Sequence, residues 1–312
     1  MIAVTFHGAG GPEVMAVDER PDPVPQSSEV LVRATHAALN PADVAQRAGN
    51  YPAPPGSPAD IPGLEVAGTV IACGEAVTAW RAGDRVFGLV GGGGLSDTVA
   101  VHERHVARIP DDLTDREAAA VPEAFITAHD AVFTRAGLAL GETLLVNGAS
   151  GGVGTAAVQL GVAAGARVLA NARSHRDALT DMGAEPCVLS EARGVDVVLE
   201  LVGAANLTGS LEALALRGRI IVVGTGAGAD AELSLRALMG RRASVMGTVL
   251  RARSMEEKAA AVQAFARSVV PHVAAGRVRP VIDRVFPVAE AAAAFDHLSA
   301  PGKLGKVLLE MS

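Results

Sequence analysis

Several glycines in the stretch Thr143–Gly154, which reads TLLVNGASGGVG, are the residues that most clearly suggest chemistry. The stretch opens with an apolar run, and the small and apolar residues that follow it in Thr155–Leu160 are spaced as in a helix. A glycine turn between a strand and a helix lets backbone N–H groups face a pyrophosphate, because no Cβ blocks the approach. The spacing, G-x-x-G-x-x-G, would also suit a glycine-rich turn of another α/β protein, but its context favours a dinucleotide site. The expected contacts are Ser150, Gly151, Gly152 and Val153.

A second segment, residues 168–174, bears on which dinucleotide would bind. NAD-dependent domains carry an acidic residue about 20 positions beyond the first glycine, where it binds the ribose hydroxyls. Here the segment reads VLANARS, and the first carboxylate comes only at Asp177. Arg173, Ser174 and Arg176 are able to hydrogen-bond a 2′-phosphate. Arginines at a helix start are mildly unfavourable, so we interpret them as functional rather than as a solvated surface. The segment therefore predicts NADPH.

The chain around this loop has the pattern of a parallel α/β sheet. From Thr114 onward apolar strands alternate with helices, which indicates right-handed crossovers and a doubly wound sheet. Thr114 and Glu117 have the spacing of a helix capping box, and Ser254–Val273 is predicted to be one long helix. Before Thr114 the sequence consists of short β-runs separated by Pro, Gly and Asp turns, which favours a small barrel. The six parallel strands are expected near 143–147, 167–171, 186–189, 195–201, 219–223 and 244–250.

Composition limits the class of protein. The 312 residues suit two domains, and the net charge of -7 with 3% aromatic residues argues against nucleic-acid binding. Cys73 and Cys187 are far apart and form no CxxC motif, which is typical of a chain in a reducing cytoplasm. The N-terminal residues lack the features of a signal peptide, and the longest apolar run, Gly151–Leu169, is interrupted by polar residues. We therefore expect a cytoplasmic protein without a membrane span.

Motifs along the whole chain resemble the zinc-free quinone oxidoreductases of the medium-chain dehydrogenase/reductase superfamily. The resemblance implies a GroES-like β-barrel domain, 1–118 completed by 268–312, and a Rossmann NADPH-binding domain, 119–267. It also implies a homodimer that forms along the sixth Rossmann strand. One departure is expected: between Glu185 and Asp196 the chain is about twenty residues shorter than the family pattern, so the helix between the third and fourth Rossmann strands should be truncated or absent. The motifs are Asn40–Asp43, Arg47–Pro52, Pro62–Gly68, Gly83–Val86, Ala119–Phe125 with Thr127-Ala128, the glycine loop, Gly247–Arg253 and Gly305–Leu309.

The same resemblance assigns roles to residues outside the glycine loop. Asn40 and Tyr51 would line the substrate pocket and orient the acceptor or the nicotinamide, and they are the candidate catalytic residues. Alternatively, Asn40 caps the helix after it and Tyr51 shields the site. Thr127 would lie near the phosphates or the nicotinamide. Residues after the fourth, fifth and sixth strands are cofactor candidates by the same reasoning, or simple strand ends; they are Val202, Gly203, Gly224, Thr225, Gly226, Val249 and Leu250.

No metal site is expected. Zinc-dependent relatives place a cysteine near the position of Asn40 and a histidine at that of Leu64, and the close pair His102 and His105 reads as an exposed turn. Without a Lewis acid, a quinone or an α,β-unsaturated carbonyl is an easier hydride acceptor than a simple ketone, because the arriving charge delocalises onto a conjugated oxygen. The alternatives are a dedicated enoyl or tailoring reductase of one metabolite, and an NADPH-binding sensor or structural protein with little turnover.

Overall fold

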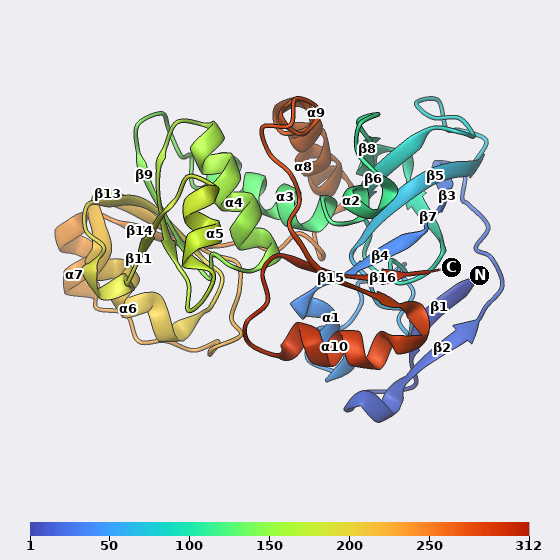
Figure 1. The fold of residues 1–312 in the computed structure, drawn as a ribbon, viewed down its shortest axis with the longest axis horizontal. Coiled ribbons are helices and arrows are strands. Elements are labelled where there is room, and N and C mark those ends of the chain that lie inside the picture. The colour runs from blue at the N-terminus through green and yellow to red at the C-terminus, as the bar shows by residue number, and fades with distance from the viewer. Residues whose placement is uncertain (312) are drawn as a thin grey trace. The chain divides into compact units, whose positions relative to one another are not determined.

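The computed structural model describes residues 1–311, which divide into two compact units (Figure 1). The first unit comprises Met1–Ile126 and the chain from Leu250 onward, and the second comprises Thr127–Val249. This division differs from the expected domains in residues 119–126 and 250–267, which belong to the first unit. The reason is the packing of helix α8 (Met255–Ser268): the ring of its Phe265 lies 5.5 Å from that of Phe87 in a barrel strand.

The first unit is built mainly from antiparallel strands. Its five-stranded sheet has the order β7-β3-β5-β6-β8, and a three-stranded sheet has the order β15-β16-β4. Nine buried valines fill one core against the five-stranded sheet, where β-branched side chains pack well. The strands are β1 (Ile2–Phe6), β2 (Met15–Glu19), β3 (Glu29–Arg33), β4 (His36–Leu39), β5 (Glu65–Cys73), β6 (Arg85–Leu89), β7 (Thr98–His102), β8 (Val106–Arg108), β15 (Ile282–Pro287) and β16 (Lys306–Glu310).

Helices complete the first unit. In Figure 1 helix α10 lies beside α1, and the two are in contact. The capping box predicted at Thr114 and Glu117 is present at the start of α2. The single helix predicted over Ser254–Val273 is wrong, because Val269 separates α8 from α9, which carries Pro271 in its first turn. The helices are α1 (Pro41–Arg47), α2 (Asp115–Ala119), α9 (Val270–Ala274) and α10 (Ala291–Ser299), and α3 (Pro122–His129) continues into the second unit.

The second unit is a six-stranded, all-parallel sheet. Its order, β11-β10-β9-β12-β13-β14, is that of a doubly wound Rossmann sheet, as predicted. Helix α4 packs over Leu144 and α6 belongs to the core around Leu145, so the two helices cover opposite faces. The last strand is shorter than expected and ends at Gly247, where its partner strand ends too. The elements are β9 (Thr143–Asn147), α4 (Gly152–Ala163), β10 (Arg167–Asn171), α5 (Arg176–Asp181), β11 (Glu185–Cys187), β12 (Val195–Glu200), α6 (Ala204–Ala213), β13 (Leu214–Val222), α7 (Leu235–Arg241) and β14 (Ser244–Gly247).

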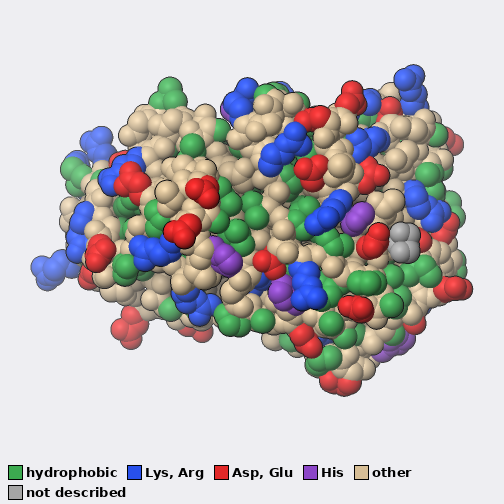
Figure 2. Space-filling view, viewed as in Figure 1, with side chains coloured by type: hydrophobic (Ala, Val, Ile, Leu, Met, Phe, Trp, Pro, Cys, Tyr) green, Lys and Arg blue, Asp and Glu red, His purple; other side chains and the backbone are tan. Residues whose placement is uncertain are grey.

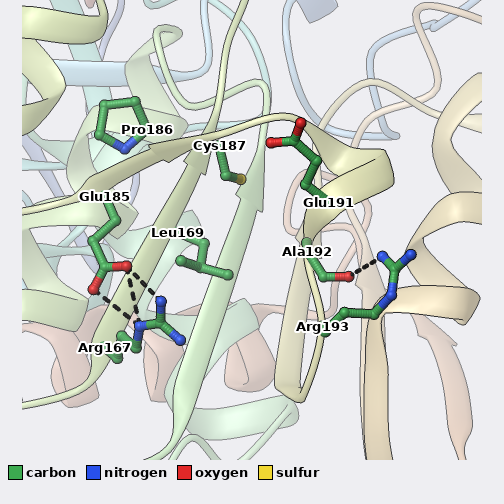
Figure 3. A pocket seen from close by; sticks show the side chains of 8 residues that line it. All are labelled: Arg167, Leu169, Glu185, Pro186, Cys187, Glu191, Ala192 and Arg193. Carbon is green, nitrogen blue, oxygen red and sulfur yellow. Dashed lines mark hydrogen bonds and ion pairs between the residues drawn. The ribbon is translucent and has the colours of Figure 1, made fainter.

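The connection between β11 and β12 contains only a 3₁₀ turn, Leu189–Glu191, which confirms the predicted loss of a crossover helix. A shallow hollow of about 280 Å³ lies at this place (Figure 3). The pair Arg167–Glu185 lies on one side of it, and Glu191 and Arg193 come from the turn on the other. The hollow is lined by Arg167, Leu169, Glu185, Pro186, Cys187, Glu191, Ala192 and Arg193.

Candidate active site

The glycine loop follows the central strand of the second unit. The backbone N–H groups of Gly148 and Ala149 both donate to the carbonyl of Asn171, at 3.0 and 3.2 Å, which ties the turn to the neighbouring strand β10. Gly148 has φ +83°, a conformation that favours glycine. A Cβ on Gly154 would lie 2.3 Å from the carbonyl oxygen of Gly148, whereas one on Gly151 would meet only that oxygen, at 3.6 Å. The loop thus needs glycine at 154 for its own packing and leaves open space at 151.

The first turn of α4 is accessible. Ser150, Gly151, Gly152 and Val153 are all partly exposed, while Gly154 behind them is buried. The leading N–H groups of a helix have no acceptors within it, and the helix dipole adds partial positive charge there. Open space at a glycine in front of such N–H groups fits a dinucleotide pyrophosphate.

A network of buried polar side chains joins the strand ends next to this loop. Glu200, at the end of β12, is almost fully buried, and Asn147 at the end of β9 donates to it at 2.6 Å. The backbone N–H groups of Val202 and Gly203 donate to the other carboxylate oxygen, at 2.8 and 2.9 Å. Asn147 also accepts from Asn171 at 2.8 Å. These contacts supply the donors that a buried carboxylate requires, and they join the ends of three adjacent strands.

The remaining cofactor candidates of the second unit lie mostly at the same edge of the sheet. Val202 and Gly203 follow β12, Gly224–Gly226 follow β13, and Val249 follows β14. The loops are tightly interlocked: a Cβ on Gly203 would lie 2.9 Å from Cα of Thr225. Thr127 is buried in α3, one turn before Asp130, whose carboxylate lies 3.4 Å from the hydroxyl of Thr248 just beyond β14. Leu250, the next residue in the chain, is buried and is the first residue of the second segment of the first unit.

The three residues predicted to bind a 2′-phosphate have different surroundings. Arg173 is exposed two residues beyond β10, and within residues 1–311 no carboxylate pairs with it. Ser174 is half-buried beside it. Arg176 begins α5 and donates to the backbone carbonyl of Pro186 at 3.3 Å, so part of its hydrogen-bonding capacity is used in the fold. Arg173 is therefore the better placed cation of the two.

In the first unit Asn40 belongs to a buried charged group with Glu65 and Lys306, which are 2% and 5% exposed. The Nδ2 of Asn40 donates to Glu65 Oε1 at 2.8 Å, and its Oδ1 accepts from Lys306 Nζ at 2.6 Å. Lys306 also donates to Glu65 at 2.8 Å, and the backbone N–H of Glu123 donates to the second carboxylate oxygen at 2.8 Å. The amide of Asn40 is therefore held in one orientation, by a cation on its oxygen and an anion on its nitrogen.

Helix α1, which begins after Asn40, is capped mainly by Asp43. The carboxylate of Asp43 accepts from the backbone N–H of Asn40 at 2.8 Å and from that of Gly63 at 2.9 Å. Burial raises the pKa of Asp43 to about 6, and the two backbone donors oppose the rise. Asp43 thus links the strand end that carries Asn40 to the end of residues 49–63, a proline-rich loop that carries Tyr51.

Tyr51 lies half-buried in that loop. Its carbonyl accepts from Arg251 Nη1 at 3.0 Å, and the guanidinium carbon of Arg251 lies 5.2 Å from the centre of its ring. Burial raises the pKa of the Tyr51 phenol, Glu123 raises it further, and Arg251 lowers it. No group within residues 1–311 is hydrogen-bonded to the hydroxyl. At neutral pH the phenol is therefore protonated and has a hydrogen bond to donate.

The histidine pair serves the packing of α8. His102 accepts from the backbone N–H of Arg104 at 3.1 Å, and His105 lies 2.9 Å from the carbonyl of Met255. Burial lowers the pKa of His105 to about 4. Across residues 1–311 we find no group of three or more His, Cys, Asp or Glu side chains able to hold a metal, and no helix long and apolar enough to cross a membrane.

A doubly wound sheet with an open glycine turn, in one chain with a barrel of antiparallel strands, defines a nicotinamide-dependent dehydrogenase or reductase of the medium-chain class. Comparison with known proteins agrees. Residues 26–111 match the alcohol dehydrogenase GroES-like domain, and residues 165–309 match the zinc-binding dehydrogenase family. The quinone oxidoreductase of Mus musculus is 33% identical, over 99% of this chain and 97% of its own length.

Solved structures show the same relationship. An alcohol dehydrogenase superfamily protein from Novosphingobium aromaticivorans is 31% identical with a TM-score of 0.88, and the match covers 100% of both chains. The CurK enoyl reductase is 25% identical with a TM-score of 0.87, over 100% of this chain and 99% of its own. The chain therefore belongs to the quinone oxidoreductase family of the medium-chain dehydrogenase/reductase superfamily, and the zinc-free branch fits. It is an oxidoreductase, and the family binds a nicotinamide cofactor.

Sequence reasoning did not assign roles to Glu65, Lys306, Arg251 or Asn147. The available signal was a charged residue at the start of an apolar strand: Glu65 precedes Val66-Ala67, and Lys306 precedes Val307–Leu309. Each strand is buried over its first four residues, so each charge needs a partner in the interior. The sequence does not show that Glu65 and Lys306 pair with each other.

Proposed function

We propose that the protein is an NADPH-dependent, zinc-independent reductase that transfers hydride to a quinone or an α,β-unsaturated carbonyl. The observation that carries this proposal is the fixed amide of Asn40, held by Glu65 and Lys306. Zinc relatives have a cysteine ligand near this position, and here an amide takes its place. Its Nδ2 donates to Glu65, and its other acceptor is the carbonyl of Ala38 at 3.5 Å, a long and weak contact. The second hydrogen would exchange this contact for an acceptor oxygen or the nicotinamide amide.

The cofactor would be held by the second unit. The N–H groups of Gly152 and Val153 would donate to the pyrophosphate, and Arg173 with Ser174 would donate to the 2′-phosphate. Because the segment after β10 has no carboxylate, nothing there repels that phosphate. When bound, the reduced nicotinamide supplies the hydride.

The acceptor chemistry requires little from the protein beyond positioning. The hydride pair forms the new C–H bond at the acceptor carbon, and the π electrons of the conjugated system shift so that the negative charge reaches the oxygen. A proton from solvent then adds to that oxygen or to the α-carbon. The protonated phenol of Tyr51 and the Nδ2–H of Asn40 stabilise the charge on oxygen by hydrogen bonds. No side chain is assigned as an essential general acid.

Titration of purified protein with NADPH and NADH, followed by addition of a quinone and an enone, tests the proposal. We expect tighter NADPH binding and turnover of both acceptors. Arg173→Ala should weaken NADPH much more than NADH, and equal effects on both would remove Arg173 from the phosphate site. Tyr51→Phe should lower turnover and spare NADPH affinity, and unchanged kinetics would leave the hydroxyl without a role.

A dedicated enoyl reductase is the second candidate, and the similarity to the CurK enoyl reductase favours it. Tight NADPH binding with no turnover of the general acceptors, but turnover of a single enoyl thioester, would support this alternative. Stoichiometric NADPH binding without oxidation by any acceptor would instead indicate a sensor or structural protein.

We further propose a homodimer formed along β14. This strand is the free edge of the six-stranded sheet, and apolar side chains near it are exposed, among them Val249 at 47% and Met239 at 75%. Two edges paired across a twofold axis would bury these side chains and satisfy the unpaired backbone groups. Light scattering of the wild type and of Val245→Lys tests this, with a dimer and a monomer expected respectively.

We also propose a cytoplasmic protein whose partner is a small molecule rather than nucleic acid or a membrane. Cys73 and Cys187 are both free thiols, as is usual in a reducing compartment. Acidic and basic side chains are interspersed over the face in Figure 2, which is not the single-sign surface that binds a polyanion. Fractionation of cells expressing the protein, and a filter-binding assay with nucleic acid, test the two parts.

A further inference from the structure

Arg251 is a buried cation whose hydrogen bonds all go to neutral acceptors. It is 5% exposed, and its three guanidinium nitrogens donate to three different groups of the first unit. Nε donates to the carbonyl of Gly91 at 2.8 Å, Nη1 to that of Tyr51 at 3.0 Å, and Nη2 to Oε1 of Gln46 at 2.5 Å. Burial of a cation is costly and lowers the pKa of Arg251, and the nearby charges of Asp43 and Glu123 oppose this shift only in part. The fold therefore retains Arg251 at an expense in stability.

Gln46 extends these contacts across the proline-rich loop. Its Nε2 donates to the carbonyl of Ala59 at 3.0 Å, while its Oε1 accepts from Arg251. One arginine and one glutamine thus hold both ends of the segment Tyr51–Ala59. This segment contains no helix or strand, so these contacts supply fixation that regular structure does not.

The same arginine contacts the ring of Tyr51, with its guanidinium carbon 5.2 Å from the ring centre. A cation over an aromatic face is attracted to it, more so when both are shielded from water. The carbonyl contact fixes the backbone of Tyr51, and the ring contact fixes its side chain. Lysine has a single nitrogen and is unable to span three acceptors and stack on a ring.

We propose that Arg251 is a positioning residue that holds the Tyr51 loop and orients the Tyr51 phenol for the acceptor. This inference rests on the proposed function of Tyr51. Arg251 itself would contact no reacting atom. It follows directly after Val249 and Leu250, so the segment expected to border the nicotinamide continues into the residue that holds the tyrosine.

Tyr51 is the only tyrosine in the chain, which gives the inference a direct spectroscopic test. The near-ultraviolet absorbance change on forming tyrosinate reports this one phenol. The variants are Arg251→Met, which removes both the guanidinium donors and the charge, and Arg251→Lys, which keeps the charge but not the guanidinium geometry. Arg267→Met is the control, because it removes the same charge from an exposed position on α8 in the same unit. Gln46→Met breaks the link to Ala59 and leaves the arginine in place.

We expect Arg251→Met to raise the midpoint of the Tyr51 titration, because a nearby cation lowers the pKa of a phenol and does so here. Its kcat with a quinone should fall about tenfold to a hundredfold, with the Kd for NADPH nearly unchanged. Arg251→Lys should show nearly the wild-type titration with reduced kcat, and Gln46→Met should also lose kcat. In a Tyr51→Phe background, Arg251→Met should have little further effect on kcat.

A titration and a kcat for Arg251→Met that match those of Arg267→Met would overturn the inference. So would an equal loss of kcat from Arg251→Met with and without the Tyr51 hydroxyl. If Arg251→Met does not fold, the kcat values of Arg251→Lys and Gln46→Met test the inference instead. A wild-type kcat in both variants would overturn the inference. If the wild type reduces no quinone or enone, the proposed function fails, and the phenol titrations alone then support or overturn the positioning of Tyr51.

Discussion

Lys306→Met removes the positive charge from the buried group that orients Asn40. Methionine has nearly the length of lysine and fills the space with little strain. It leaves Glu65, which is 2% exposed, with only the Asn40 side chain and the backbone N–H of Glu123 as donors. It also frees the Oδ1 of Asn40 and the carbonyl of Leu39, both of which accept from Lys306.

The magnitude follows from the burial of both charges. Removing one partner of a buried ion pair leaves the other uncompensated, which typically lowers the free energy of unfolding by about 3–5 kcal/mol. Glu65→Gln should also lower the free energy of unfolding. With Glu65→Gln and Lys306→Met combined, no uncompensated charge remains. The double variant should therefore be more stable than the sum of the single effects predicts, by about 2 kcal/mol or more.

Urea unfolding followed by Trp80 fluorescence measures this coupling. Trp80 is the only tryptophan and packs against the valine core of the first unit, so it reports the unit that contains the pair. Arg267→Met, an exchange at an exposed basic residue of the same unit, is the control and should change stability by less than about 0.5 kcal/mol. Additive effects of Glu65→Gln and Lys306→Met, within about 0.5 kcal/mol, would refute the reasoning.

Three further predictions concern other parts of the two units. Gly154→Ala should destabilise the second unit by about 1–3 kcal/mol in thermal unfolding, because the new Cβ overlaps a backbone oxygen, whereas Gly151→Ala should leave stability nearly unchanged and weaken NADPH binding; equal melting temperatures would contradict this. The pKa of Asp43 is raised from 3.8 to about 6, so its stabilising contribution is present below pH 3.8 and lost as pH rises through 6. Asp43→Asn should therefore cost up to about 3 kcal/mol more near pH 4 than above pH 7 in urea unfolding, and a pH-independent cost would contradict the raised pKa. Asn147→Asp places a second carboxylate 2.6 Å from Glu200, so thermal stability should fall at neutral pH and recover as pH is lowered, and no recovery would disprove the contact.

The sequence determined the parts of this protein that depend on neighbours along the chain. The glycine turn, the strand before it and the helix after it are recognisable within twenty residues, because glycine conformation and helix spacing are local properties. Strands β9 and β10 lie where they were predicted, and the missing crossover helix before β12 was visible as a short segment. The zinc-free family resemblance also came from the sequence alone.

Only the tertiary structure decided which distant residues meet. Lys306 reaches Glu65 across 241 positions, and Arg251 reaches Gln46 across 205. A periodic apolar pattern shows that α8 buries one face, yet it does not identify the surface beneath it. For this reason the expected domain boundary differs from the division into units. Burial and pairing depend on the folded arrangement of several segments. For that reason the sequence named Asn40 and Tyr51, whereas the structure identified the charged residues that hold them.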